Sequence, residues 1–186
     1  MMLTAVSRIF PGGSERKLCG IETDELANLV AVLRALPSPR ERFAPEVTAM
    51  VRSTLGAHGW KTKFRFGDFP ELGGTQAAVT LDAARDWRET PCGHHHRFLL
   101  EICTDNRQAI LLNLAKLEFG ARRFEDHGEQ RIALPIMLTV TRDQKEKLKQ
   151  TAPIDSAIGP FEEYVAQANG PWRGLITHQI QAIIIG

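Results

Sequence analysis

The 186-residue sequence predicts an α/β domain in which helices flank a mixed central β-sheet. Short apolar runs, some alternating with polar residues as in strands, are interspersed along the chain with amphipathic stretches of helical period. The chain is 43% hydrophobic and 24% charged, which suits a single domain with one buried core. We expect a single domain over residues 1–186, in which residues 1–44 form an N-terminal helical part and residues 45–186 form the core.

The first half of the chain predicts two helices followed by two strands. Thr23 is suited to cap the first helix, and Pro37 lies just beyond its last apolar residue. Pro45 suits the first position of the second helix, and Gly59 ends it. Charged residues then alternate with apolar ones, as in a half-buried strand. The predicted elements are helices over 23–36 and 45–59, strands over 61–66 and 75–81, and a loop over 67–74.

Residues 97–103 predict a buried strand that carries acidic groups. With a period of two, Glu101, Cys103 and Asp105 share one face of the strand. A glutamate beside an apolar core is costly to bury unless it is paired, hydrogen-bonded or bound to a metal ion. This cost makes Glu101 the first candidate for a functional residue.

The period then changes to that of a helix, capped by Asp105 or Asn106 and ended by Gly120. A strand follows over 132–141, where Pro135 favours an edge position or a bulge. The remaining predicted elements are helices over 143–150 and 161–168 and a strand over 175–185.

The charge and the cysteine content indicate which functional classes and which cellular compartment suit this chain. The net charge is +1, so the chain lacks the global basic field of many non-specific nucleic-acid binders. Three cysteines, an odd number far apart in sequence, favour a reducing cytoplasm over a disulfide framework. No apolar run is long enough to span a membrane. Local basic clusters at 40–42, 61–65, 122–123 and 142–149 would line a polyanion groove if they folded onto one side.

The order of elements resembles the BamHI/BglII-type branch of the type II restriction endonucleases, within the PD-(D/E)xK nuclease superfamily. The resemblance spans residues 45 to 186. The matching stretches are His58-Gly59-Trp60-Lys61, the strand 97–103 with Glu101, Asn113-Leu-Ala-Lys116, the strand ending in Thr141-Arg142, and the C-terminal run 183–186.

The resemblance implies a homodimer that binds double-stranded DNA and hydrolyses a phosphodiester bond with Mg²⁺ held by carboxylates. Glu101 would be a metal ligand and catalytic residue. Cys103 stands where the family usually has Lys, Gln or Glu. The second acid is Asp82 or Asp86, moved by an insertion, or Asp105 from the same strand face. If none serves, the site is inactive, and the chain is a DNA-binding or assembly protein that keeps the fold.

Further residues are assigned by the same resemblance or by their chemistry. A histidine such as His94 titrates near working pH and would act as a ligand or general base beside the phosphate. The residues expected to contact DNA are Arg142, Lys145, Lys116 and Asn106.

The cysteines and histidines allow two other interpretations. Thiolate and imidazole are the usual zinc ligands, so Cys92, His94, His96 and Cys103 form a candidate Zn²⁺ site. Alternatively, Cys103 or Cys92 is a nucleophile activated by His94 or His96.

Overall fold

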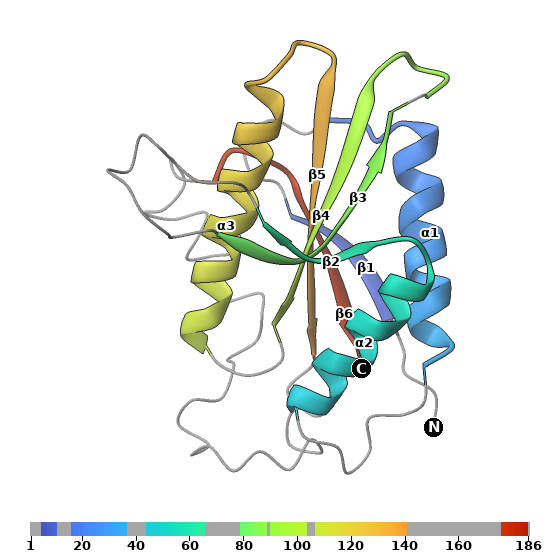
Figure 1. Cartoon of the computed structure of the whole chain (residues 1–186), viewed down its shortest axis with the longest axis vertical. Helices are drawn as coiled ribbons and strands as arrows, with labels where there is room; N and C mark the ends of the chain where they lie inside the picture. Colours follow the sequence, from blue (N-terminus) through green and yellow to red (C-terminus); the bar gives the residue numbers. More distant parts are fainter. Residues whose placement is uncertain are drawn as a thin grey trace.

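The computed structural model describes residues 5–10, 16–36, 44–65, 79–88, 90–103, 107–140 and 176–185. These residues form a six-stranded sheet with helices on both faces (Figure 1). The predicted fold class, a mixed sheet flanked by helices, is confirmed. The elements are β1 (Ala5–Phe10), α1 (Gly20–Arg34), α2 (Ala44–Ala57), β2 (Lys61–Arg65), β3 (Thr80–Trp87), β4 (His95–Cys103), α3 (Arg107–Glu125), β5 (Arg131–Val140) and β6 (Ile180–Ile185).

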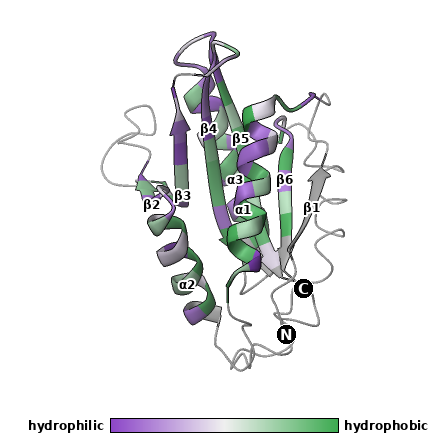
Figure 2. Ribbon diagram, turned by 90° about the vertical axis from the view of Figure 1, so that its right-hand side faces the viewer, coloured by the Kyte–Doolittle hydropathy of each residue, from purple (hydrophilic) through white to green (hydrophobic). Residues whose placement is uncertain are grey.

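The strand order in the sheet is β1-β6-β5-β4-β3-β2. Strands β4, β5 and β6 are parallel, and α3 is the crossover between β4 and β5. The outer strands β1, β3 and β2 pair antiparallel. In Figure 2, α1 lies in front of the sheet and α3 behind it. The sheet therefore separates two apolar layers.

Strand β4 contributes to both layers because its side chains alternate between the two faces. Phe98 and Leu100 pack into the layer of α1 and α2, whereas Leu99 and Cys103 pack beneath α3. Fully burying each Leu or Phe side chain stabilises the fold by about 1.5–3 kcal/mol. By the same alternation, Glu101 lies on the α3 face.

Helix α1 begins at Gly20, three residues before the predicted start at Thr23. The cap is Cys19, whose backbone N–H donates to Glu22 Oε2 at 3.0 Å. A glutamate three residues into a helix commonly satisfies the capping residue in this way. Helix α2 agrees with prediction, and its buried residues Val47, Val51 and Leu55 lie in the α1 layer.

The predicted end of α3 at Gly120 is wrong, because the helix continues to Glu125. The sequence places residues 121–125 between this helix and the strand predicted over 132–141. Instead, Ala121 and Phe124 extend the apolar stripe of Leu117 and are buried against the sheet. Tertiary packing along this stripe outweighs the cost of about 1 kcal/mol for a glycine inside a helix.

Strand β3 starts at Thr80, near the end of the strand predicted over 75–81, and continues six residues beyond it to Trp87. Cross-strand contacts stabilise it. Asp86 of β3 forms two hydrogen bonds with Arg97 of β4, from Nε at 2.6 Å and from Nη2 at 2.9 Å. Arg85 donates to Glu25 of α1 at 2.9 Å.

Pro135 was expected at an edge or bulge, but β5 lies between β4 and β6. The pairing of β5 with β6 starts only at Ile136, so Pro135 has a single neighbouring strand at its own position. Strand β1 was not predicted. It lies within residues 1–44, which were expected to be helical, and it pairs with β6 at the other end of the chain. The loop predicted over 67–74 and the helices over 143–150 and 161–168 lie outside the described residues, as does most of the strand predicted over 75–81.

Candidate active site

Two carboxylates meet where β3 and β4 lie side by side. Ala83 of β3 pairs with Leu100 of β4, and Asp82 immediately precedes Ala83 while Glu101 immediately follows Leu100, so the antiparallel register places the two acids side by side. Both are buried, with exposed fractions of 7% and 2%. Asp82 Oδ2 accepts a hydrogen bond of 2.6 Å from the backbone N–H of Ile102, the residue after Glu101. Two acidic side chains therefore occupy adjacent positions at one end of the sheet.

Each carboxylate contacts a cation from a different helical layer. Lys116 of α3 places its Nζ 2.5 Å from Glu101 Oε1. Arg52 of α2 donates from Nε to Asp82 Oδ1 at 2.9 Å, and its Nη2 contacts the same oxygen. The site thus joins both layers of the fold, with Lys116 23% exposed and able to contact a ligand.

The pKa of Glu101 is raised from 4.5 to about 7. Burial is the main cause, because it removes water from the charged form. The negative charge of Asp82 raises this pKa further, and Lys116 and Arg52 only partly oppose the shift. At neutral pH Glu101 is close to half ionised, a condition that a bound cation would relieve.

A break in regular pairing accompanies Asp82. The pairs Thr62–Ala83 and Phe64–Leu81 flank Lys63 and Asp82, and Lys63 has a φ of 52°. Positive φ is uncommon for a residue other than glycine and costs about 1–3 kcal/mol. This local distortion lies beside the position at which the Asp82 carboxylate reaches across to the backbone of β4.

Among the other predicted site residues that the structure describes, Asp86 and His94 lie away from this pair, and Cys103 lies two residues beyond Glu101 but is buried. Asp86 lies four residues along β3 from Asp82, a rise of about 13 Å, and pairs with Arg97. His94 precedes β4, whose start is about 20 Å from Glu101 along the strand. Cys103 is fully buried beneath α3, and its carbonyl accepts from Thr139 Oγ1 at 3.0 Å. Asp105, Asn106, Arg142 and Lys145 lie outside the described residues.

The predicted zinc set is also not assembled. Cys103 lies seven residues beyond His96 on β4, a rise of about 24 Å, and on the opposite face of the sheet. Instead, Cys92 and His96 lie beside Cys19, with Cys92 Sγ 3.1 Å from His96 Nε2. Cys92 is exposed, and a hydrogen bond with Thr90, followed by bonds with His94 and His96, lowers its pKa to about 6. Sequence reasoning missed Cys19 because it lies 77 residues from His96.

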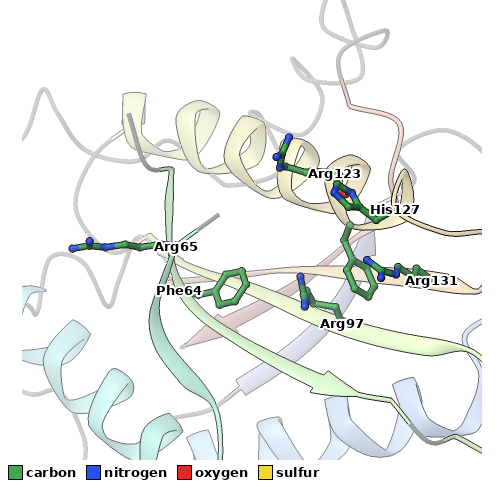
Figure 3. Close-up of a pocket in the computed structure, with 7 residues that line it drawn as sticks. Phe64, Arg65, Arg97, Arg123, His127 and Arg131 are labelled. Atoms are coloured by element: carbon green, nitrogen blue, oxygen red, sulfur yellow. The ribbon is translucent and has the colours of Figure 1, made fainter. Parts of the chain in front are cut away.

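An arginine-rich pocket of about 170 Å³ opens on the α3 face of the sheet (Figure 3). Arg97 lies over the ring of Phe124 at 4.3 Å, and Arg131 lies over the same ring at 5.4 Å. Two basic clusters from the sequence meet here, since Arg65 of β2 and Arg123 of α3 both line the pocket. The lining residues are Phe64, Arg65, Arg97, Arg123, Phe124, His127 and Arg131.

A second acidic group joins α3 to the segment before β6. Glu118 Oε2 lies 2.9 Å from the backbone nitrogen of His178 and 3.0 Å from His178 Nδ1. The other ring nitrogen of His178 lies 3.0 Å from Glu125 Oε2. Burial raises the pKa of Glu118, but hydrogen bonds from His178 and Thr177 outweigh it and lower the pKa to about 2. The same contacts raise the pKa of His178 to about 9 despite its burial.

The chain has a restriction-endonuclease-like fold. It is similar to restriction endonuclease BglII, in a crystal structure complexed with a DNA 16-mer, with a TM-score of 0.58 and 12% sequence identity. The similarity covers 100% of this chain and 78% of that chain. No family model matches the chain, and neither does any curated protein. None of the helices that the structure describes has the length and apolar character needed to cross a bilayer.

Proposed function

We propose that this protein is a metal-dependent, sequence-specific endonuclease of double-stranded DNA, a type II restriction enzyme. The observation that carries the proposal is the meeting of Asp82, Glu101 and Lys116 at one end of a restriction-endonuclease-like sheet. Burying two adjacent carboxylates and a lysine costs free energy of folding, and these groups bury little apolar surface that would offset the cost. Such an arrangement suits a site for a divalent cation and a phosphodiester.

Asp82 and Glu101 are the residues that would hold Mg²⁺. Their oxygen atoms are the ligands this ion prefers. The raised pKa of Glu101 reflects its burial first and the neighbouring charge of Asp82 second, and a bound cation would offset both. Bound Mg²⁺ supplies an activated water molecule and neutralises charge on the scissile phosphate. Arg52 orients Asp82 by holding Oδ1, which leaves Oδ2 toward β4.

Lys116 would take the role of the residue that the resembled family carries two residues after the glutamate, usually Lys, Gln or Glu. Cys103 occupies that position and is buried beneath α3, so its thiol does not serve there. Lys116 reaches Glu101 from the helix that follows the strand, and it remains partly exposed. We assign it to the stabilisation of negative charge on the phosphate during cleavage.

DNA contacts would extend from this site along the α3 face. The arginine-rich pocket lies on that face and is suited to phosphate oxygens. Arg142, Lys145 and Asn106 remain predicted DNA contacts, and Asp105 a predicted catalytic residue. We further propose that residues 1–186 act as one nuclease domain, that two copies form a homodimer, and that the enzyme works in the cytoplasm.

The test is incubation of purified protein with phage and plasmid DNA in Mg²⁺, beside Glu101→Ala and the exposed-residue control Glu129→Ala. We expect discrete fragments from wild type and from the control, and intact DNA from Glu101→Ala or in the presence of a chelator. Fragment ends would then give the target sequence. Intact DNA from wild type with both Mg²⁺ and Mn²⁺ would overturn the proposal.

The second candidate is a DNA-binding or assembly protein that keeps the fold but does not cut. Cys103 at the usual lysine position and the engagement of Asp82 by Arg52 favour it. It predicts a shift of duplex DNA in a gel without cleavage in either metal, and the same shift with Glu101→Ala.

A further inference from the structure

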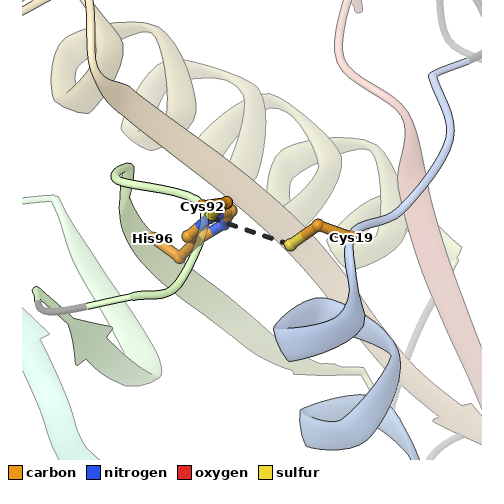
Figure 4. A group of neighbouring side chains, drawn as sticks. All are labelled: Cys19, Cys92 and His96. Carbon is orange, nitrogen blue, oxygen red and sulfur yellow. Dashed lines mark hydrogen bonds between the residues drawn. The ribbon is translucent and has the colours of Figure 1, made fainter.

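Two cysteines and a histidine from distant segments converge on the α1 face of the sheet (Figure 4). Cys19 precedes α1, Cys92 lies in the turn before β4, and His96 belongs to β4. His96 Nε2 lies 3.1 Å from Cys92 Sγ and 3.8 Å from Cys19 Sγ. All three ligand atoms lie within 4.8 Å of one another.

These separations are close to those around a tetrahedral zinc ion. With Zn–S bonds of about 2.3 Å and Zn–N bonds of about 2.0 Å, ligand atoms lie about 3.5–3.8 Å apart. The group needs only small side-chain adjustments to reach that geometry. We propose that Cys19, Cys92 and His96 bind one structural Zn²⁺ ion.

The environment of His96 supports this assignment independently. The ring is 1% exposed, and its Nδ1 makes no hydrogen bond of good geometry, but faces Glu22 Oε1 at 3.5 Å. Glu22 is fully buried and held by Arg16 and by the backbone N–H of Cys19. A carboxylate behind one ring nitrogen is the usual support for a metal-bound histidine, because it fixes the proton there and leaves the other nitrogen free for the ion.

His94 is the fourth ligand in this proposal. It lies two residues before His96, its ring is 6.2 Å from that ring, and it forms a hydrogen bond with Cys92. His94 lies outside the group of ligand atoms within 4.8 Å of one another, so its partly exposed side chain would turn toward Cys92 on metal binding to complete a Cys₂His₂ set. Structural zinc sites are closed by four protein ligands in this manner, without an open position for substrate.

The zinc group is separate from the carboxylates, and its assignment does not depend on the proposed nuclease activity. His96 and Glu101 are five residues apart on β4, a rise of about 17 Å, and they point to opposite faces. The ion would tie the start of α1 to the turn before β4. Its role is therefore to stabilise the fold, since binding to the folded chain alone adds directly to stability.

The experiment is metal binding by the full chain after reduction and removal of metal. Zn²⁺ is titrated in competition with a chromophoric chelator, and Co²⁺ is used as a spectroscopic probe. We expect one ion per chain, with the thiolate charge-transfer absorption and intense visible bands of a tetrahedral Co²⁺ site. Because Cys92 is exposed, Cys92→Ser keeps the fold, and it should weaken Zn²⁺ binding by about 100-fold or more.

Cys103→Ala is the matched control, because it removes a cysteine from the opposite face and should leave the stoichiometry and the Co²⁺ spectrum unchanged. Glu22→Gln should still bind one ion per chain, but its affinity for Zn²⁺ should be about 10–100-fold lower than that of wild type. The proposal is overturned if wild type binds no ion or if Cys92→Ser binds Zn²⁺ as tightly as wild type. It is also overturned if Cys19 and Cys92 form a disulfide and the protein, once reduced, still binds no Zn²⁺.

Discussion

Glu101 and Glu118 are both almost fully buried, with exposed fractions of 2% and 3%, yet their pKa values are shifted in opposite directions. The pKa of Glu118 is about 2 and that of Glu101 is about 7. Glu118 has contacts to Thr177 and to two nitrogen atoms of His178. Glu101 forms one ion pair, with Lys116, and has the carboxylate of Asp82 and the charge of Arg52 nearby.

Under the proposed function, the difference separates a structural acid, Glu118, from a metal-binding one, Glu101. The contacts of Glu118 replace the water lost on burial, so its charge stabilises the fold. The charge of Glu101 is under-compensated and destabilises the fold until something positive binds. Costs of this kind are retained where function requires them. The comparison is sharpened by giving both glutamates the same substitution, to glutamine, which preserves size and removes charge.

The largest expected effect is on DNA cleavage. Glu101→Gln should reduce Mg²⁺-dependent cleavage at least about 1,000-fold, a barrier increase of about 4 kcal/mol, because it removes a charged metal ligand. Glu118→Gln should cleave at the wild-type rate at temperatures where it is folded. Rates of plasmid linearisation measure both. Equal losses in the two variants would show that the two acids do not differ in function.

A smaller effect is expected on stability, with the order of the variants reversed. Glu118→Gln should lower the free energy of unfolding at pH 7 by about 3 kcal/mol, because it breaks a buried ionic group and leaves His178 with one carboxylate. Urea denaturation measures this change. A loss below about 1 kcal/mol would mean that the hydrogen bonds of Glu118, rather than its charge, hold this junction.

The two acids should also give opposite pH dependence. Glu101 keeps its proton in the folded state up to a pH of about 7, whereas in the unfolded chain it ionises near 4.5. Folding therefore binds a proton in this window, and the contribution of Glu101 to stability falls as the pH rises through it. A shift of this size corresponds to about 3 kcal/mol.

In metal-free buffer, Glu101→Gln should accordingly gain stability relative to wild type between pH 4.5 and pH 8, by up to about 3 kcal/mol. The folded pKa of Glu118 is depressed instead, so its contribution is complete above pH 4.5 and is lost as the pH falls toward 2. Denaturant curves across the pH range measure both differences. Parallel pH profiles for the two variants would contradict the assignment.

The layers and most elements follow from local periodicity, and so does Glu101 as the leading candidate residue. An acid at a strand position with a period of two, next to an apolar run, is visible in the sequence alone. The partners of Glu101 were less visible. The second acid was open between Asp82, Asp86 and Asp105, because the sequence does not give the antiparallel register that sets Asp82 beside Glu101.

Long-range packing explains the remaining errors. Helix α3 passes through Gly120 because Ala121 and Phe124 pack against the sheet, which no local signal predicts. Arg52 contacts Asp82 from another layer of the fold. Cys19, and not Cys103, lies beside Cys92 and His96 in the proposed zinc site, because residues far apart in sequence meet beside β4. Such contacts are set by topology, and single-sequence patterns do not contain them.

The smallest expected effect is stabilisation by Mg²⁺. An ion that binds only the folded state adds about 1.4 kcal/mol at ten times its dissociation constant. At pH 8, where Glu101 is ionised, Mg²⁺ should raise the melting temperature of wild type and of Glu118→Gln but not of Asp82→Asn. At pH 5.5 the proton on Glu101 competes with the ion, so the wild-type shift should be lost. Thermal scans with and without Mg²⁺ measure these shifts. An equal shift in Asp82→Asn would show that Mg²⁺ binds somewhere other than this pair of carboxylates.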